Sequence, residues 1–129
     1  MRFTDSITID ASAGTSQASL FVEATADYLK DHFPGAPTLP GLVMLESAVR
    51  AAAALWEAAA PEHEGAAALE HVERLQIVRP VVPGETLIVD ATIEAGDGRP
   101  GTRWFMARAT VGGETAMRAR FRLIRGETR

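Results

Sequence analysis

Two side chains that can transfer protons lie a short distance apart in the sequence, His32 and Glu46. His32 lies in Asp31–Gly41, where three prolines and two glycines in eleven residues favour a rigid, turning loop over a helix or a strand. Histidine titrates near neutral pH, so a histidine held in such a loop can act as a general base or a general acid. The alternative is that His32 only packs against the loop or caps it.

Glu46 falls in the second turn of the segment that follows, beside an apolar stripe that includes Leu42 and Val49 if the segment is helical. Burial disfavours the charged form of a carboxyl group, and a carboxyl group that keeps its proton can donate it in acid catalysis. The alternative is an i,i+4 ion pair with Arg50 along a polar edge that Glu57 continues. Both interpretations stay open.

Gly41 follows Pro40 at the point where this helix would begin. The first N–H groups of a helix lack partners within the helix and lie at the positive end of its dipole. Glycine allows a carbonyl oxygen to approach the backbone closely, so the Gly41 amide could polarise an acyl carbonyl while the neighbouring carbon loses a proton. The alternative is a glycine that only turns the chain.

Other kinds of site find little support in the sequence. His63 and His71 flank a polar, Glu-rich connection, which is typical of solvent-facing histidines, and no group of residues has metal-ligand spacing. The chain has no cysteine, which excludes disulfides and cysteine nucleophiles. It also lacks the serine-hydrolase elbow, the phosphate-binding loop and the dinucleotide fingerprint. Trp56 and Trp104 lie on periodic segments, which predicts core or interface positions.

Composition predicts one globular domain over residues 1–129. With 129 residues, of which 47% are apolar, the chain can form one core and is too short for two. Its net charge of −4 and the absence of a basic run argue against nucleic-acid binding. No stretch is long and apolar enough to insert in a membrane. The absence of cysteine fits a cytoplasmic protein, which is the location we expect.

The pattern of apolar residues predicts the elements that position these side chains. Leu42–Ala60 has no proline or glycine and predicts one long helix that Pro61 ends, and its many alanines predict burial on nearly all sides. The remaining segments predict strands: Ser6–Asp10 and Ser19–Ala24 as a hairpin, then His71–Val78, Thr86–Glu94, Arg103–Val111 and Thr115–Ile124 as an antiparallel meander. The expected fold class is α+β, with a curled antiparallel sheet wrapped around one central helix.

Two motifs resemble a known family. HFPGAPTLPGLVMLE, His32–Glu46, closely resembles the H-F-P-G-x-P-x-x-P-G-x-x-x-L-E signature of FabZ-type β-hydroxyacyl-acyl-carrier-protein dehydratases. RPVVPGETL, Arg79–Leu87, is similar to the R-P-V-x-P-G-[DE] turn of the same family. The order of helix and strands also agrees, so the resemblance covers nearly the whole chain.

The resemblance implies a hot-dog fold and a homodimer or a larger assembly such as a dimer of trimers. It implies that His32 of one subunit faces Glu46 of the other across a tunnel for an acyl chain on acyl carrier protein or coenzyme A. His32 would remove the proton next to the thioester carbonyl, the Gly41 amide would hold that carbonyl, and Glu46 would protonate the leaving hydroxyl. Phe33 and Pro40 would contact the substrate. This chemistry requires no metal and no redox cofactor.

The chain departs from the family pattern at three positions. Asp31 replaces the glycine before the histidine, and a nearby carboxylate would favour the imidazolium form of His32. Ala36 stands where the family often has arginine. Arg50 stands where the family commonly has glutamine, and a guanidinium paired with Glu46 would hold that carboxylate ionised.

Two other functions are compatible with the same fold. A hot-dog thioesterase would use the helix carboxylate to activate water or to attack the acyl carbon, and it would not require His32. A non-catalytic acyl-binding subunit would result if Arg50 neutralised Glu46. For carrier-dependent functions, Arg118, Arg120 and Arg122 could form a basic docking patch, or simply a solvated strand face.

Overall fold

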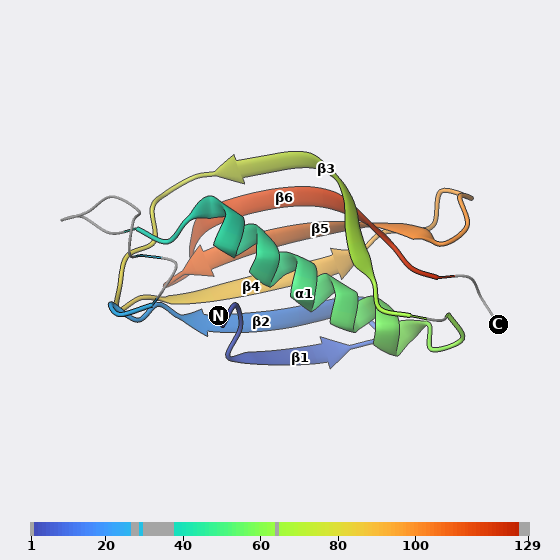
Figure 1. The fold of residues 1–129 in the computed structure, drawn as a ribbon, viewed down its shortest axis with the longest axis horizontal. Helices are drawn as coiled ribbons and strands as arrows, with labels where there is room; N and C mark the ends of the chain where they lie inside the picture. Colours follow the sequence, from blue (N-terminus) through green and yellow to red (C-terminus); the bar gives the residue numbers. More distant parts are fainter. Residues whose placement is uncertain (1, 27–28, 30–37, 64, 127–129) are drawn as a thin grey trace.

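The computed structural model describes residues 2–26, 29, 38–63 and 65–126. Its strands form one six-stranded antiparallel sheet in the order β1-β2-β4-β5-β6-β3, which curls around a single long helix (Figure 1). The elements are β1 (Ser6–Asp10), β2 (Thr15–Phe21), α1 (Gly41–Ala59), β3 (Ala68–Ile77), β4 (Thr86–Ile93), β5 (Thr102–Val111) and β6 (Glu114–Ile124). The expected α+β class is therefore confirmed.

The core lies between α1 and the concave face of the sheet. On β6, Met117, Ala119, Phe121 and Leu123 are buried, and the residues between them point to the other face, as the period of two predicts. On α1, Met44, Ala48, Leu55 and similar residues pack against the strands. No helix in the described ranges has the length and apolar character needed to cross a membrane.

Three expected elements have different boundaries or surroundings in the structure. The strand expected at His71–Val78 is β3, Ala68–Ile77, which begins three residues earlier. The second strand, expected at Ser19–Ala24, is Thr15–Phe21, because pairing with β1 and β4 already begins after the Gly14 turn. Gly14 has a positive φ of 69°, which suits glycine at this turn. The helix is also less enclosed than its alanines suggested, since Leu42 is 73% exposed and Arg50 is exposed as well.

The strand β3 does not neighbour β4, as a simple meander would require. It pairs with β6, at the edge of the sheet opposite β1. The connection from β3 to β4 contains Pro80 and Pro83, which favour an extended path, and it crosses the start of the helix, where the Leu39 N–H donates to the Val81 carbonyl at 2.7 Å. A connection of this length allows the chain to cross to the other side of β5 and β6.

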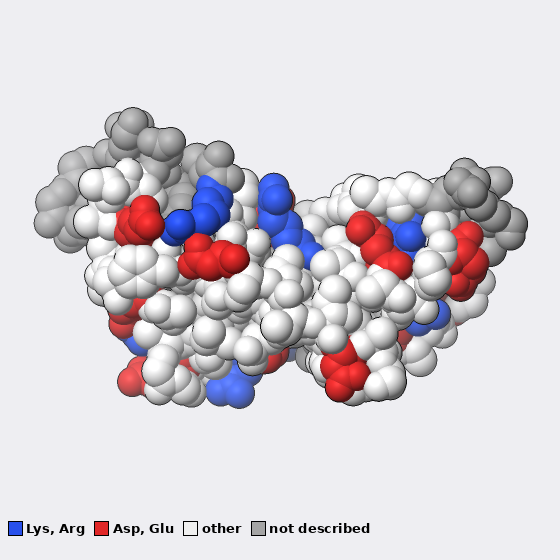
Figure 2. All heavy atoms as spheres, turned by 90° about the horizontal axis from the view of Figure 1, so that it is seen from below, with Lys and Arg blue, Asp and Glu red and all other residues white. Residues whose placement is uncertain are grey.

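The two edge strands differ in character. β1 is short, and the side of the molecule on which it lies is mostly uncharged at its centre, with charged side chains around that area (Figure 2). β3 is longer and exposes apolar side chains at its C-terminal end, where Leu75 is 36%, Ile77 46% and the following Val78 47% exposed. An exposed apolar edge strand is suited to pairing with another chain.

Candidate functional site

The helix α1 begins without a capping side chain. Pro40 is the N-cap residue, and its carbonyl accepts hydrogen bonds from the Val43 and Met44 amides at 3.0 and 3.3 Å. No acidic residue lies in the first turn to offset the helix dipole. Within the described ranges, the Gly41 amide has no acceptor. Among the described residues, the positive end of α1 therefore has a donor that an approaching oxygen could accept from.

Gly41 has a backbone conformation that other residues also adopt, because its φ does not lie in the left-handed region. A β-carbon at this position would lie 3.1 Å from Ile77 Cδ1 and 3.2 Å from its Cγ1. The start of α1 thus lies close to the Ile77 side chain of β3, and a side chain at position 41 would require Ile77 or the helix start to shift. The absence of a side chain also leaves the amide accessible to a ligand.

A pocket of about 290 Å³ lies next to Gly41, at the end of the sheet where α1 begins. Side chains from α1, from the end of β3 and from the segment after it surround the Gly41 backbone. The lining residues are Thr38, Leu39, Gly41, Met44, Ile77, Val78, Arg79 and Pro80. Most of these side chains are apolar, so the pocket combines one open amide with walls that suit a hydrocarbon chain.

An ion pair braces the segment on the far side of this pocket. Arg79 Nη2 contacts both carboxylate oxygens of Glu85, at 3.1 and 2.8 Å, and the Val82 N–H donates to Glu85 at 2.9 Å. The hydrogen bond from Val82 lowers the pKa of Glu85, and Arg79 lowers it further against the opposing effect of partial burial. The motif RPVVPGE signalled this turn in the sequence, but not that it supports the pocket.

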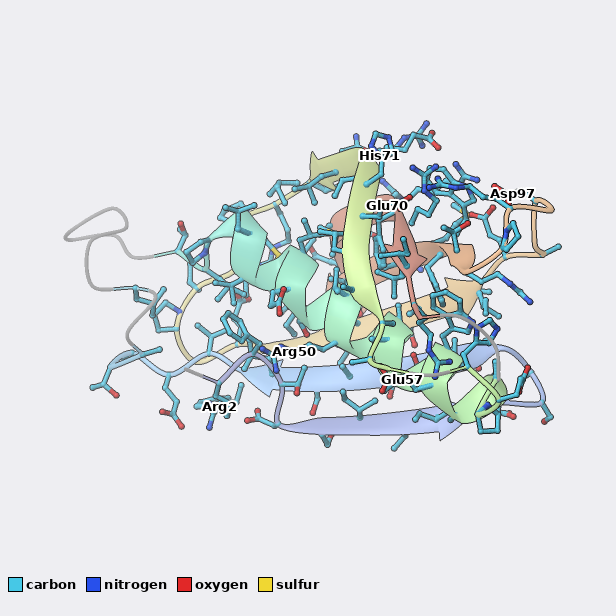
Figure 3. The ribbon with its side chains drawn as sticks, turned by 45° about the vertical axis from the view of Figure 1, so that its right-hand side comes forward. Arg2, Arg50, Glu57, Glu70, His71 and Asp97 are labelled. Atoms are coloured by element: carbon cyan, nitrogen blue, oxygen red, sulfur yellow. The ribbon has the colours of Figure 1, made fainter. Side chains whose placement is uncertain are left out.

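Glu46 forms the i,i+4 pair that was one of its two interpretations. Arg50 Nε lies 3.1 Å from Glu46 Oε1, and the two side chains are 51% and 39% exposed. The Arg50 guanidinium also lies 4.8 Å from the centre of the Phe3 ring, on the side of α1 that faces β1 (Figure 3). The contact of Phe3 with Arg50 could not be predicted from the sequence, because contact between a chain's first residues and a helix leaves no local pattern.

Glu46 and Gly41 do not share a pocket within the described part of the chain. The pocket next to Gly41 is lined by Met44 on the β3 side of the helix, and Glu46 is not among its lining residues. Positions 44 and 46 are two apart and so lie on nearly opposite faces of a helix. The Glu46 carboxylate therefore lies outside the pocket beside Gly41 in one chain.

The loop that carries His32 falls outside the described residues, as do its neighbours Asp31 and Phe33. The other two histidines lie elsewhere. His63 packs against the Trp56 ring with centroids 5.8 Å apart, and His71 meets Trp104 edge-on at 6.0 Å. In the ranges that the structure covers, no group of three or more potential ligand residues could hold a metal ion.

Comparison with known proteins identifies relatives of this chain. Residues 8–114 match the family model described as ApeI-like, ApeI dehydratase. The 3-hydroxyacyl-[acyl-carrier-protein] dehydratase FabZ of Desulforamulus reducens is 33% identical over 107 residues, which are 82% of this chain and 73% of the relative. The same enzyme of Thermus thermophilus is 39% identical over 88 residues, which are 67% of this chain and 61% of the relative. That of Polynucleobacter asymbioticus is 32% identical over 92 residues, and the match spans 60% of its length.

Solved structures share the fold. The dehydratase heterocomplex ApeI:P from Xenorhabdus doucetiae matches with a TM-score of 0.70 and 21% identity, covering 95% of this chain and 96% of that one. The E. coli PaaI protein from the phenylacetic acid degradation operon matches with a TM-score of 0.68 and 20% identity, and the match covers 89% of this chain and 75% of that one. The expected hot-dog fold is confirmed. Because the family model matches most of its length, the chain belongs to the ApeI-like dehydratase family and is a FabZ-type hot-dog protein.

Proposed function

We propose that this chain dehydrates β-hydroxyacyl thioesters on acyl carrier protein to trans-2-enoyl thioesters, in fatty-acid synthesis or a related lipid or polyketide pathway. One observation carries the proposal: the Gly41 amide, which has no acceptor among the described residues, lies beside an apolar pocket, within the motif that resembles the dehydratases. Relatives named as 3-hydroxyacyl-[acyl-carrier-protein] dehydratases support it. A cytoplasmic location suits the cysteine-free composition.

The reaction assigns one task to each of three groups. The substrate carbonyl accepts a hydrogen bond from the Gly41 amide, which stabilises the negative charge that develops on this oxygen. His32 removes the proton from the carbon next to the carbonyl, and the electrons of that C–H bond form the new double bond. The C–O bond to the β-hydroxyl breaks as Glu46 supplies a proton, so water leaves. Phe33 and Pro40 flank the acyl group.

A second copy of the chain completes the site in this proposal. Glu46 does not line the pocket beside Gly41, and in this proposal His32 of one chain and Glu46 of the other act on the same substrate. The edge strand β3, with its exposed Leu75 and Ile77, offers an open backbone edge and apolar side chains for antiparallel pairing with the same strand of a partner. Such a dimer would contain two composite sites.

The ion pair between Glu46 and Arg50 favours a thioesterase as the second candidate. A carboxylate that is paired with a guanidinium and partly exposed is suited to activate water, which hydrolysis of a thioester requires. This reaction would release a free thiol and a hydroxy acid, and it would not depend on His32.

One substrate distinguishes the two functions. A 3-hydroxyacyl thioester is incubated with the wild-type protein, His32→Ala, Glu46→Gln and the control His71→Ala, whose ring packs on Trp104 away from the pocket. Enoyl thioester is measured by its absorbance and free thiol by a thiol reagent. We expect enoyl product from wild type and control, and a loss of at least about 100-fold in each of the other two variants. Thiol release without enoyl product would refute the dehydratase.

A further inference from the structure

The connection from β3 to β4, residues 78–85, is held in place at both of its ends. At its start, the Val78 amide donates to the Ala116 carbonyl of β6 at 2.8 Å. At its end, the Glu85 carbonyl accepts from the Val22 amide at 3.0 Å. We refer to residues 78–85 as the crossing segment. Its backbone is thus tied to β6 on one side and to the chain that follows β2 on the other.

An ion pair fixes the path of the crossing segment between these two ends. Arg79 Nη2 donates to both carboxylate oxygens of Glu85, and the two side chains are only 28% and 24% exposed. Arg79 Nε also donates to the Pro80 carbonyl at 3.2 Å, and Glu85 accepts from the Val82 amide at 2.9 Å. A charge-assisted pair that is partly shielded from water is stronger than an exposed one. The side chains at the two ends of the crossing segment therefore restrain the backbone between them.

The crossing segment in turn holds a residue that lies two positions before Gly41. The Leu39 amide donates to the Val81 carbonyl at 2.7 Å, and the two side chains are 3% and 0% exposed. Because this hydrogen bond is buried, losing it would leave two polar groups without partners. Pro40, which joins Leu39 to Gly41, has a φ of −60° that its ring fixes. A displacement of the Val81 carbonyl would therefore be passed to the Gly41 amide through few rotatable bonds.

The position of the Gly41 amide should affect the chemical step more than the binding of the substrate. Negative charge develops on the carbonyl oxygen in the transition state, so a donor that is slightly misplaced loses most of its effect there. The carbonyl of the bound substrate carries less charge, and the apolar walls of the pocket contribute to its binding independently of the amide. A displaced amide should therefore lower kcat and leave KM nearly unchanged.

We propose that Arg79 and Glu85 are positioning residues, which set the place of the Gly41 amide through the hydrogen bond between Val81 and Leu39. The inference rests on the proposed function, in which this amide holds the thioester carbonyl. Neither side chain exchanges a proton with the substrate, and both act on the reaction only through the crossing segment. Arg79 also lines the pocket beside Gly41, so the variants must separate positioning from direct contact with the substrate.

Three variants make this separation. Arg79→Met removes the donors and keeps a long side chain, and Arg79→Lys keeps a cation that can pair with Glu85. The matched control Arg99→Met breaks another pair of the same kind, in which Arg99 contacts both carboxylate oxygens of Glu70 at 3.0 and 3.2 Å. Arg99 lies in the hairpin between β4 and β5, at the end of the sheet away from the start of α1 (Figure 1). Thermal unfolding first shows that all three variants are folded.

The kinetic test uses a 3-hydroxyacyl thioester of N-acetylcysteamine, which has no phosphate that an arginine could bind. For Arg79→Met we expect kcat for enoyl formation to fall about tenfold and KM to change less than about twofold. Arg79→Lys should keep kcat within about threefold of wild type, and Arg99→Met within about twofold. An unchanged kcat in Arg79→Met, with or without a rise in KM, would overturn the proposal. Equal losses of kcat in Arg79→Met and Arg99→Met would also overturn it, because they would reflect a general effect on the fold.

The infrared band of a bound thioester carbonyl tests the amide without any reaction. The probe is butanoyl-N-acetylcysteamine with carbon-13 at the carbonyl, which has no β-hydroxyl to eliminate. A hydrogen bond to this oxygen lowers the stretching frequency. We expect binding to wild type and to Arg99→Met to lower it equally, and binding to Arg79→Met to lower it less than about half as much.

This measurement separates the two ways in which the account can fail. If the infrared pattern is as expected but the wild-type protein forms no enoyl product, the proposed function fails while the positioning role stands. If the wild-type protein shifts the band no more than Arg79→Met does, the positioning role is refuted, whether or not enoyl product forms.

Discussion

At its C-terminal end α1 is capped by Arg125, whereas no side chain of the described residues caps its N-terminal end. Arg125 is only 8% exposed and donates to the carbonyls of Trp56, Ala60, His63 and Gly65 at 2.9 to 3.3 Å. Its guanidinium also lies 5.4 Å from the Trp56 ring centre. Arg125, which follows the last strand, therefore binds the Trp56 carbonyl at the end of α1, which also accepts from the Ala60 amide, and three carbonyls of the segment after the helix.

The N-terminal end has the opposite character. Pro40 provides no cap, the first turn has no acid, and in the described ranges nothing accepts from the Gly41 amide. The fold thus closes one end of the same helix and leaves the other open beside a pocket. This difference indicates that the C-terminal end serves stability and that the N-terminal end is available to a ligand.

The largest effect is expected at the closed end. Arg125→Met removes the donors that satisfy four carbonyls, so we expect the free energy of unfolding to fall by about 3 kcal/mol. Urea denaturation measures it. The exposed Arg118→Met provides the control, with an expected change below about 0.5 kcal/mol. A loss of less than about 1 kcal/mol in Arg125→Met would show that the cap contributes little.

At the open end, activity should respond more than stability. Gly41→Ala places a methyl group 3.1 Å from Ile77 Cδ1 and 3.2 Å from its Cγ1, and we expect the crowding to displace the helix start and its amide. We expect kcat for enoyl formation to fall about tenfold with a change in unfolding free energy below about 1 kcal/mol. Adding Ile77→Ala removes both crowding carbons, and kcat should then recover to within about threefold of wild type. An unchanged kcat in Gly41→Ala would argue against a role for this amide.

The contribution of Glu85, which pairs with Arg79 beside the pocket, to the free energy of unfolding should depend on pH. Because the pKa of Glu85 is lowered in the folded state, its carboxylate adds stability at pH values above about 4.5, and this contribution is lost as the pH falls through the lowered value. We expect Glu85→Gln to be about 1 kcal/mol less stable than wild type at pH 7, with the difference shrinking in acid. A difference that stays constant from pH 7 to pH 3 would contradict this account.

The smallest effect is expected at Arg50, which lies between the two ends. Its contacts with Glu46 and Phe3 are partly exposed, so each contributes little to stability. Arg50→Gln restores the family residue, and we expect dehydration to stay level or rise by up to about threefold. Steady-state kinetics measures this. A loss of more than about tenfold would show that the ion pair supports catalysis.

The bounds of α1, β4, β5 and β6 could be predicted from the sequence alone. The alternation in β4, β5 and β6 and the proline-free run of α1 predicted these elements to within one residue. The position of β3 could not be predicted, because the pattern of a strand does not specify its neighbour. Nothing in a period of two favours pairing with β6 over β4.

The candidate site was predictable in its residue types but only partly in its surroundings. The motif singled out Gly41 and Glu46, and helical spacing allowed either a buried acid or a pair with Arg50. Deciding between them required the position of Phe3 and of the sheet around the helix. Arg125 lies far along the chain from the carbonyls that it caps, so no local pattern could connect them.

Mixing two inactive variants tests most directly whether an imidazole and a carboxyl group from different chains form each site. His32→Ala and Glu46→Gln chains are purified separately, unfolded together and refolded, and enoyl formation is measured. If the groups come from different chains, a mixed dimer has one intact site, and random pairing predicts about a quarter of wild-type activity. Activity no higher than that of the separate variants, although mixed dimers form, would contradict the account.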